Sequence, residues 1–413
     1  MKCGLLGRKL GHSYSPQIHA HMGSYRYELF EKEPEELEAF LRNGDFTGIN
    51  VTIPYKKEVI PYLDELSPIA QRMGAVNTIL RRADGSLFGH NTDYFGFSSL
   101  VQRSGLQVAG KKVLVLGSGG ASNTAAKVLE DLRAEVVIIS RSGENSYQNL
   151  HRHADAAVIV NTTPVGMYPN TGVSPVDLTI FPHLEGVLDV IYNPARTQLL
   201  LDAQERGVQQ ENGLWMLVAQ AKEAAEHFGG TMLEDAIIEN VYNTLSDQMQ
   251  NIVLIGMPGC GKSTVGKALA DILGRSFVDA DAKIVQLAGK PIPRIFAEDG
   301  EEVFREYETR VLAELGKQSC LVIATGGGCV TRQWNYPLLH QNSRILWLKR
   351  DLASLATDGR PLSQANKLTQ MYEVRRPLYE AFADCAVDNN GPLEETIRAI
   401  RTKLEESYEN SGH

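Results

Sequence analysis

The sequence predicts an α/β protein with two separate parallel sheets, and two glycine-rich segments carry this prediction. Each segment follows a continuous apolar run, at 111–117 and at 251–255, and precedes a helix-patterned stretch. That order is expected where a buried parallel strand turns into a helix. The glycine-rich segment after 251–255 is of a type that follows the first strand of its domain. Residues 1–250 must therefore fold as a separate part.

Composition places the chain among globular proteins. It has 413 residues, of which 43% are hydrophobic and 22% are charged, which suits about two to four domains. We see neither a run of 18 apolar residues nor a basic-then-apolar leader, so we expect no membrane span and no export. The net charge of −9 argues against a general nucleic-acid surface. Five cysteines without a C-x-x-C pair favour reduced thiols in the cytoplasm over a disulfide frame or a zinc site.

The first glycine-rich segment, GSGGAS at 117–122, resembles the dinucleotide fingerprint with its third glycine replaced by Ser122. NAD sites have an acid after the next strand, here 135–139, but this chain has Ser140 and Arg141 there. A guanidinium at this place suits the 2′-phosphate of NADP. The residues predicted to bind NADP(H) are Gly117, Ser118, Gly119, Gly120, Ala121, Ser140 and Arg141.

Four motifs surround this part of the chain, namely G-H-S-x-S-P at 11–16, N-V-T-x-P-x-K at 50–56, G-A-V-N-T at 74–78 and N-T-D at 91–93. Singly, each has an ordinary explanation: Ser13 and Ser15 could cap a helix, Lys56 could be a solvated lysine, and the Asn and Asp residues could belong to turns. Together, in this order and at compatible spacing, they resemble the shikimate dehydrogenase family over residues 1–248.

The resemblance implies a role for each motif. The family's two serines bind the substrate carboxylate, which implies Ser13 and Ser15, and its catalytic pair corresponds to Lys56 and Asp93. Reducing a ring ketone needs a proton on oxygen, and an ammonium held by a carboxylate can supply it. The other implied contacts are Thr52, Asn77, Tyr192 and Gln220 to the substrate and Met167 beside the nicotinamide.

The second glycine-rich segment, GMPGCGKST at 256–264, matches the phosphate-loop pattern G-x-x-x-x-G-K-[ST] in full. Its glycines let backbone N–H groups point at one anion, and the following helix adds its positive N-terminal end. Lys262 would neutralise phosphate charge, and the Ser263 hydroxyl would bind Mg²⁺. The residues predicted to bind ATP here are Gly259, Cys260, Gly261, Lys262, Ser263 and Thr264.

A strand at 276–279 ends in Asp279, with Asp281 two residues further on. Asp279 could hold Mg²⁺ through water, and Asp281 could accept a proton from a substrate hydroxyl, although an Asp-rich turn is the plain alternative. The remaining motifs are G-E-E-V-F-R at 300–305, A-T-G-G-G at 324–328, G-R-P-L at 359–362 and R-R-P-L-Y at 375–379. With the phosphate loop, they resemble shikimate kinase over 251–405.

This second resemblance implies a shikimate site made of Asp281, Arg305, Gly326, Gly327, Gly328 and Arg375. Two arginines suit a carboxylated substrate because a guanidinium pairs with a carboxylate in fork geometry. The family's lid arginine, here Arg360, reaches the phosphates, but the run from it to Arg375 is rather short. We interpret Cys260 and Cys329 as small packing residues beside the site.

We therefore expect a two-lobed dehydrogenase followed by a P-loop kinase domain of the nucleoside-monophosphate-kinase type. The boundaries expected are a substrate lobe at 1–103 and 213–248, a Rossmann NADP lobe at 104–212, a very short junction at 246–250 and the kinase at 249–413. The chain would reduce 3-dehydroshikimate to shikimate with NADPH and phosphorylate shikimate with ATP and Mg²⁺, in aromatic amino acid biosynthesis. The alternatives are an NAD-dependent quinate/shikimate dehydrogenase, a kinase for another small hydroxy acid, or one non-catalytic half. Oligomeric state stays open.

Overall fold

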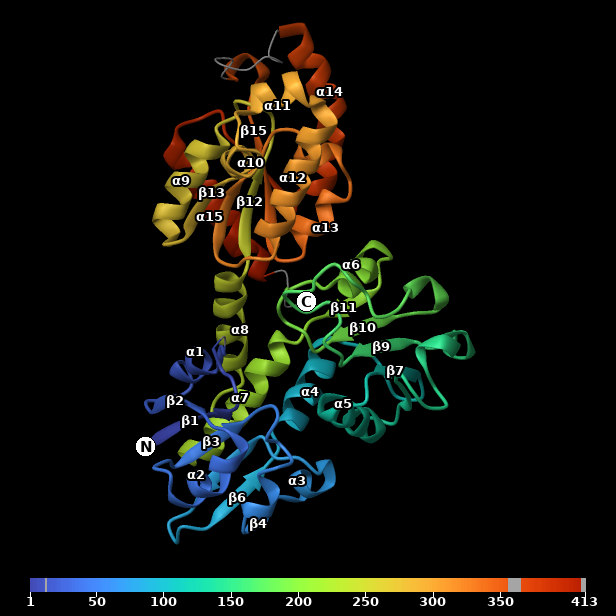
Figure 1. Ribbon diagram of the computed structural model, residues 1–413, viewed down its shortest axis with the longest axis vertical. Coiled ribbons are helices and arrows are strands. Elements are labelled where there is room, and N and C mark those ends of the chain that lie inside the picture. The colour runs from blue at the N-terminus through green and yellow to red at the C-terminus, as the bar shows by residue number, and fades with distance from the viewer. Residues whose placement is uncertain (12, 356–364, 410–413) are drawn as a thin grey trace. The chain divides into compact units, whose positions relative to one another are not determined.

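The computed structural model describes residues 1–11, 13–355 and 365–409. The chain divides into two compact units (Figure 1). Unit 1 comprises Met1–Met167, Val173–Tyr192 and Leu199–Leu245. Unit 2 comprises Tyr168–Gly172, Asn193–Gln198 and Ser246–His413. Among the helices of the described residues, none is both long enough and apolar enough to cross a membrane.

Unit 1 begins with a six-stranded mixed sheet in the order β2-β1-β3-β5-β6-β4. β1 pairs in parallel with β2 and β3, whereas β5 is antiparallel to β3 and β6. The strand at the N-V-T-x-P-x-K motif ends at Val51, and a turn follows it. The elements of this lobe are β1 (Lys2–Gly7), α1 (Ser15–Ala20), β2 (Arg26–Glu31), α2 (Leu37–Asn43), β3 (Gly48–Val51), β4 (Glu65–Leu66), α3 (Pro68–Met73), β5 (Thr78–Arg81) and β6 (Leu87–His90).

The second sheet of unit 1 has five strands in the order β11-β10-β9-β7-β8, and each neighbouring pair is parallel. Both faces are covered, because Val113 and Val115 of β7 belong to a core with α4 and α5, while Leu114 and Leu116 belong to one with α6. The elements are α4 (Asp93–Arg103), β7 (Lys112–Leu116), α5 (Gly120–Asp131), β8 (Glu135–Ile139), β9 (Val158–Asn161), β10 (Gly186–Asp189), α6 (Gln198–Glu205) and β11 (Gln209–Glu211).

Two helices complete this part of the chain, α7 (Leu214–Gly229) and α8 (Ala236–Met249). α7 packs against α4 and contacts α1, so it returns to the first sheet's lobe as expected. α8 continues through the predicted short junction, which is therefore helical as far as Met249. Its buried positions keep helical spacing, at Ile238, Val241, Leu245 and Met249.

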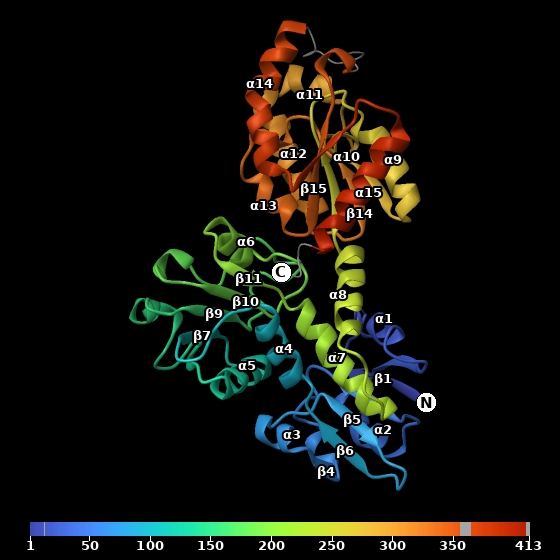
Figure 2. The ribbon, with the colours of Figure 1, turned by 180° about the vertical axis from the view of Figure 1, so that it is seen from behind.

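Unit 2 has a five-stranded sheet in the order β13-β14-β12-β15-β16, with each neighbouring pair parallel. In both ribbon views, α9 and α15 lie on one side of the sheet and α12 to α14 on the other (Figures 1 and 2). The elements are β12 (Asn251–Ile255), α9 (Lys262–Leu273), β13 (Ser276–Asp279), α10 (Ala280–Ala288), α11 (Ile292–Glu298), α12 (Gly300–Gly316), β14 (Leu321–Ala324), α13 (Asn335–His340), β15 (Ser343–Lys349), α14 (Ala365–Phe382), β16 (Cys385–Asp388) and α15 (Leu393–Glu409).

Short 3₁₀ helices occupy several of the connections in both units. They are Pro34–Glu36, Ile60–Tyr62, Tyr147–His153, Leu178–Ile180, Cys329–Thr331 and Leu352–Ser354. The first strand of each five-stranded sheet, β7 and β12, lies inside its sheet rather than at an edge. Both glycine-rich loops therefore follow an interior strand at its carboxyl end, which is where parallel α/β sheets place their ligand sites.

Candidate active sites

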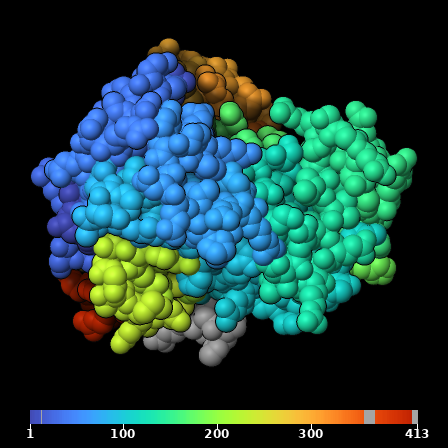
Figure 3. Space-filling view, turned by 90° about the horizontal axis from the view of Figure 1, so that it is seen from below, coloured from blue at the N-terminus to red at the C-terminus, as the bar shows by residue number. Residues whose placement is uncertain are grey.

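The first candidate site is a cleft of about 630 Å³ in unit 1. Its lining comes from the six-stranded sheet and its loops, from α4 and α7, and from Ala121, Val190 and Tyr192 of the second lobe. Figure 3 shows the two lobes side by side, with the first in blue and the second in green. The cleft collects all of the predicted catalytic and substrate-binding residues of this unit, namely Ser13, Ser15, Thr52, Lys56, Asn77, Asp93, Tyr192 and Gln220.

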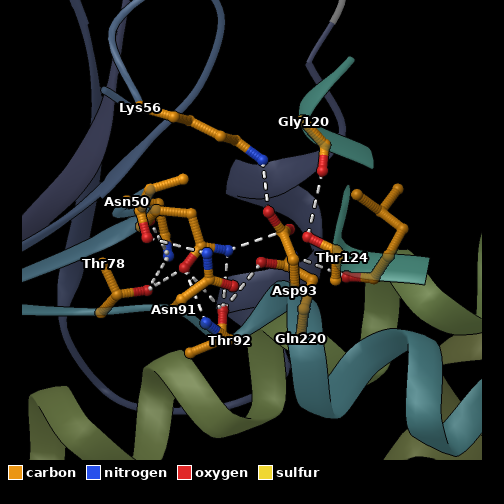
Figure 4. Close-up of polar contacts among 12 residues, drawn as sticks. Asn50, Lys56, Thr78, Asn91, Thr92, Asp93, Gly120, Thr124 and Gln220 are labelled. Atoms are coloured by element: carbon orange, nitrogen blue, oxygen red, sulfur yellow. Dashed lines mark hydrogen bonds and ion pairs between the residues drawn. The ribbon is translucent and has the colours of Figure 1, made fainter. Parts of the chain in front are cut away.

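Lys56 and Asp93 form an ion pair in this cleft (Figure 4). Lys56 lies on the turn after β3, and Asp93 is the first residue of α4. The Lys56 Nζ atom lies 2.6 Å from Asp93 Oδ2. The two side chains are 30% and 16% exposed, so the pair is shielded yet open to the cleft. The turn itself is anchored by the buried Tyr55, whose hydroxyl donates to the Lys32 carbonyl oxygen at 2.5 Å.

Asn77 holds the second oxygen of the Asp93 carboxylate. Its Nδ2 donates to Asp93 Oδ1 at 3.0 Å and to Thr92 Oγ1 at 3.0 Å, and its Oδ1 accepts the Thr92 N–H at 2.7 Å. The Thr92 hydroxyl in turn lies 3.3 Å from Gln220 Oε1 on α7. Sequence reasoning missed Thr92, although it stands inside the N-T-D motif and is fully buried between the two predicted substrate contacts.

The two serines near the start of the chain face the same cleft. The N-cap residue of α1 is Tyr14, which makes no capping hydrogen bond through its side chain. Ser13 Oγ instead accepts the N–H of Ser15 at 3.2 Å. Ser13 Oγ thus binds the first N–H group of α1, and both serines line the cleft. His12, between Gly11 and Ser13 in the motif, lies outside the described residues.

The loop after β7 has the backbone that a dinucleotide pyrophosphate requires. Gly117 has φ 116°, and a Cβ there would lie 2.8 Å from Thr162 Oγ1. α5 starts at Gly120 with Gly119 as its N-cap, so no side chain covers the first N–H groups of this described helix. Ser122, which replaces the third glycine, is buried and donates from Oγ to the Gly117 carbonyl oxygen at 2.7 Å. The observed residues thus fit an NADP pyrophosphate.

The other residues predicted to hold NADP follow neighbouring strands. Leu116 pairs with Ile139 of β8 and with Asn161 of β9. The segments after these three parallel strands therefore lie together at the carboxyl ends of the strands. Ser140 is half-buried and its hydroxyl donates to the Ser142 carbonyl oxygen. Arg141 is exposed, as a guanidinium that binds a phosphate must be. Met167, in the loop after β9, has 44% of its surface exposed.

The second candidate site is the loop between β12 and α9. Gly256, Gly259 and Gly261 have φ of 144°, 82° and 94°, which only glycine adopts readily. Lys262 begins α9, and its buried Nζ donates to the carbonyl oxygens of Gly256 at 2.9 Å and Met257 at 3.0 Å. The lysine ammonium is thus held at the loop, where phosphate oxygens would be bound. Thr264 is exposed on the same helix, and the Cys260 side chain is buried.

The predicted ligands for Mg²⁺ lie next to each other. The Ser263 hydroxyl donates to Asp279 Oδ2 at 2.6 Å. Asp279 Oδ1 accepts the N–H groups of Asp281 at 3.0 Å and Ala282 at 3.3 Å, which caps α10 and fixes the carboxylate. Hydroxyl and carboxylate oxygens at the phosphate loop are the donors that Mg²⁺ prefers, so these residues fit the ion.

The glycine triplet after β14 touches the residues predicted to bind the kinase substrate. A Cβ on Gly326 would lie 2.7 Å from Asp281 Oδ1, and one on Gly328 would collide with the Arg305 guanidinium. Arg375 donates from Nη1 to the Gly327 carbonyl oxygen at 3.1 Å. Residues from α10, α12, α14 and this loop therefore converge on one place. Arg360, the predicted lid arginine, lies outside the described residues.

Glu308 is a member of this cluster that sequence reasoning missed. It lies on α12, three residues after Arg305, and Arg305 Nη1 lies 2.7 Å from its Oε2. The carboxylate is buried, with 1% of the side chain exposed, and burial raises its pKa although the Arg305 guanidinium opposes the shift. The nearby Cys329 thiol has its pKa raised to about 12 by burial, which agrees with the packing role expected for it.

The pair Arg305–Glu308 gives a stability prediction. Glu308→Ala should lower the free energy of unfolding of unit 2 by about 3–5 kcal/mol, because it leaves a buried guanidinium without its closest carboxylate. Urea unfolding followed by kinase activity measures the change. Glu301→Ala is the matched control: Glu301 also pairs with Arg305, at 3.1 Å, but is 66% exposed, so its removal should cost under about 1 kcal/mol. Equal losses in both variants would contradict the role given to Glu308.

Two family models match the chain. Residues 5–79 match the shikimate dehydrogenase substrate binding domain, and residues 258–405 match shikimate kinase. These two matches fall in unit 1 and unit 2, respectively.

Known proteins resemble the first part of the chain over almost their whole length. An NADP(+) shikimate dehydrogenase of Clostridium perfringens (strain SM101 / Type A) is 38% identical over 264 residues, covering 59% of this chain and 97% of the relative. The crystal structure of a chorismate mutase/shikimate 5-dehydrogenase fusion from Clostridium acetobutylicum has a TM-score of 0.57 at 36% identity, covering 59% of this chain and 96% of that one. The Thermus thermophilus shikimate 5-dehydrogenase, solved with NADP(H) and shikimate, has a TM-score of 0.53 at 31% identity, covering 59% and 99%.

Proposed function

The chain belongs to the shikimate dehydrogenase family and carries a shikimate kinase domain after it, and from this premise we propose which residues perform its two consecutive reactions. Unit 1 reduces 3-dehydroshikimate to shikimate with NADPH, and unit 2 transfers a phosphoryl group from ATP to shikimate. The first two relatives are NADP(+) shikimate dehydrogenases. The alternative of an NAD-dependent quinate/shikimate dehydrogenase is therefore not favoured. The domain boundaries proposed are those expected from the sequence, with the kinase beginning near residue 249.

The observation that carries the proposal for unit 1 is the Lys56–Asp93 pair, 2.6 Å apart in a cleft that the predicted substrate contacts also line. NADPH, bound by the loop after β7 and by Arg141, supplies the hydride. Ser13 and Ser15 bind the substrate carboxylate and orient the ring. Lys56 Nζ then gives a proton to the developing alkoxide, and Asp93 keeps the ammonium in place.

Asn77 has two tasks in this scheme. It contacts a substrate hydroxyl, and it holds Asp93 Oδ1 so that Oδ2 stays directed at Lys56. Thr92 fixes Asn77 through both of its amide atoms and links it to Gln220. Three substrate-facing groups are therefore connected by one set of hydrogen bonds, which fixes their geometry before substrate binds.

In unit 2, Asp281 accepts the proton of the shikimate hydroxyl that attacks ATP. Arg305 and Arg375 pair with the substrate carboxylate, against the backbone of the glycine triplet 326–328. Ser263 and Asp279 would hold Mg²⁺, which would help to neutralise the phosphate charge, and Lys262 offsets the same charge. Arg360 completes the phosphate contacts in this proposal.

A coupled assay tests the whole function. The full chain is supplied with 3-dehydroshikimate, NADPH and ATP–Mg²⁺, while NADPH absorbance and shikimate 3-phosphate are followed. We expect one phosphorylated product for each NADPH consumed. Loss of NADPH without any phosphate transfer would restrict the function to reduction, and equal rates with quinate and NAD would restore the alternative substrate.

Arg141 gives a specific test of the cofactor. Arg141→Ala should raise the KM for NADPH by roughly 10-fold, because a charge-assisted bond to the 2′-phosphate is lost at an exposed position. The KM for NADH, which lacks that phosphate, should stay the same. Arg152→Ala, another exposed arginine of the same lobe, is the matched control and should change neither value. Parallel effects on the two cofactors would show that Arg141 does not hold the 2′-phosphate.

The partners of this chain are small molecules, with neither nucleic acid nor membrane indicated by what it resembles. A cytoplasmic location is part of the proposal. Its support is that the cysteines are free in the described chain, at Cys3, Cys260, Cys320, Cys329 and Cys385.

A further inference from the structure

Two histidines and a glutamate meet in unit 1, on β6 and on α7, the helix that also carries Gln220. His90 ends β6, three residues before Asp93, and Glu223 and His227 lie on α7, one helical turn apart. Their ligand atoms all lie within 4.8 Å of one another. We propose that His90, Glu223 and His227 form a binding site for a transition-metal cation of the zinc class.

The geometry of the three side chains suits one small cation. His90 Nε2 lies 3.6 Å from Glu223 Oε1, and the rings of His90 and His227 have centroids 4.4 Å apart. Zinc bonds of about 2.0–2.2 Å place tetrahedral ligands roughly 3.3 Å from each other. A pair 4.8 Å apart must close by roughly 1.5 Å, which rotation of the two α7 side chains can supply.

Two buried polar atoms of this cluster are unsatisfied among the described residues. Among the residues that the structure describes, neither His90 Nε2 nor Glu223 Oε2 makes a hydrogen bond, although both atoms are buried. His90 as a whole is only 7% exposed. A buried imidazole nitrogen and carboxylate oxygen without partners are unfavourable, and a cation between them would satisfy both.

The other nitrogen of His90 is arranged as a metal ligand requires. To bind a cation through Nε2, the ring must carry its proton on Nδ1. Ser67 Oγ lies 2.7 Å from His90 Nδ1 and can accept a hydrogen bond from the Nδ1–H group. Metal-binding histidines donate their second N–H in this manner, which fixes the tautomer and the ring plane.

The donor set selects the class of ion. Imidazole nitrogens suit zinc, copper, iron and nickel, whereas magnesium and calcium take oxygen ligands almost throughout. Two histidines and one glutamate leave a fourth position for water or another ligand. A bound cation would tie β6 to α7, and thereby Asp93 to Gln220, so we expect it to stabilise unit 1 and the frame of the reductase cleft.

The test uses the full, tag-free chain and Co²⁺, whose absorption reports its ligands, with Zn²⁺ as competitor. We expect one Co²⁺ per chain with a four-coordinate d–d spectrum that Zn²⁺ abolishes, and a rise in the melting temperature of unit 1. Glu223→Gln and His227→Asn should each weaken binding by roughly 100-fold or more and remove the temperature rise. His151→Ala, an exposed histidine outside the cluster, is the control and should leave both unchanged.

Three results would overturn the proposal. The first is no Co²⁺ binding by the unchanged chain, which does not depend on how any variant folds. The second is binding that persists in both Glu223→Gln and His227→Asn, because the ion would then lie elsewhere, for example at Asp279. The third is a thiolate-to-cobalt charge-transfer band, which would place the cation on a cysteine. Reductase activity of the metal-free variants shows that unit 1 is still folded.

Discussion

Lys56→Ala should slow the turnover of 3-dehydroshikimate by roughly 10²–10⁴-fold, the range that a lost general acid produces. Among the described residues that line the cleft, Lys56 is the lysine whose ammonium group is paired with Asp93. Without it the developing alkoxide loses the proton donor that Asp93 positions, and the carboxylate of Asp93 remains close to the negative charge. The measurement is NADPH oxidation at saturating substrate.

Lys57 provides the matched control for this prediction. It is the next residue along the same turn, and it is exposed, so Lys57→Ala removes an ammonium without disturbing the cleft. We expect its turnover rate to stay within about twofold of that of the unchanged enzyme, as is usual for a surface change. Phosphorylation of added shikimate should be normal in both variants. If Lys56→Ala reduced 3-dehydroshikimate as fast as Lys57→Ala, another group would have to donate the proton.

The strands β7 and β12 could be predicted from the sequence because buried parallel strands consist of continuous apolar runs. β12 was expected at 251–255 and is observed there, and β7 lies within the expected 111–117. Both faces of a parallel strand are covered, so its interior positions are apolar, and the polar residues Lys112 and Asn251 stand only at the starts of β7 and β12.

The spacing of apolar residues indicates that the predicted junction at 246–250 continues a helix. Ile238, Val241, Leu245 and Met249 recur at spacings of three and four residues, which continues the apolar stripe of α8 beyond the predicted boundary. The polar residues between them, such as Ser246 and Asp247, resemble a linker only when that spacing is ignored. A domain boundary predicted from polarity alone is therefore placed inside such a helix instead of at its end.

The site residues found from the sequence are those that belong to ordered motifs, whereas the missed ones act through other residues. Thr92 and Glu308 touch predicted site residues and hold them in place. A hydroxyl beside a catalytic acid and a glutamate in a helix with many charges look ordinary, since their roles depend on burial that local sequence does not report. The i, i+3 spacing of Arg305 and Glu308 was the available clue.

Lys262→Ala should lower the rate of shikimate phosphorylation by roughly 10²–10³-fold, because it removes one preorganised positive group aimed at the transferring phosphate. The ammonium is buried, and its two bonds to the carbonyl oxygens of Gly256 and Met257 hold it at the loop before ATP binds. A flexible surface lysine would first have to lose side-chain entropy and hydration, but this one has already done so in the folded chain.

Lys267→Ala separates this effect from a general loss of positive charge. Lys267 lies on the same helix, α9, but is exposed, so its removal changes the net charge equally and leaves the phosphate loop intact. The assay supplies shikimate and ATP–Mg²⁺ directly, which makes it independent of the reductase. We expect phosphorylation to fall only in Lys262→Ala, and reduction to be unchanged in both variants. If the two variants phosphorylated shikimate equally fast, the loop at 256–264 would not be the ATP site, and the second reaction would lose its structural basis.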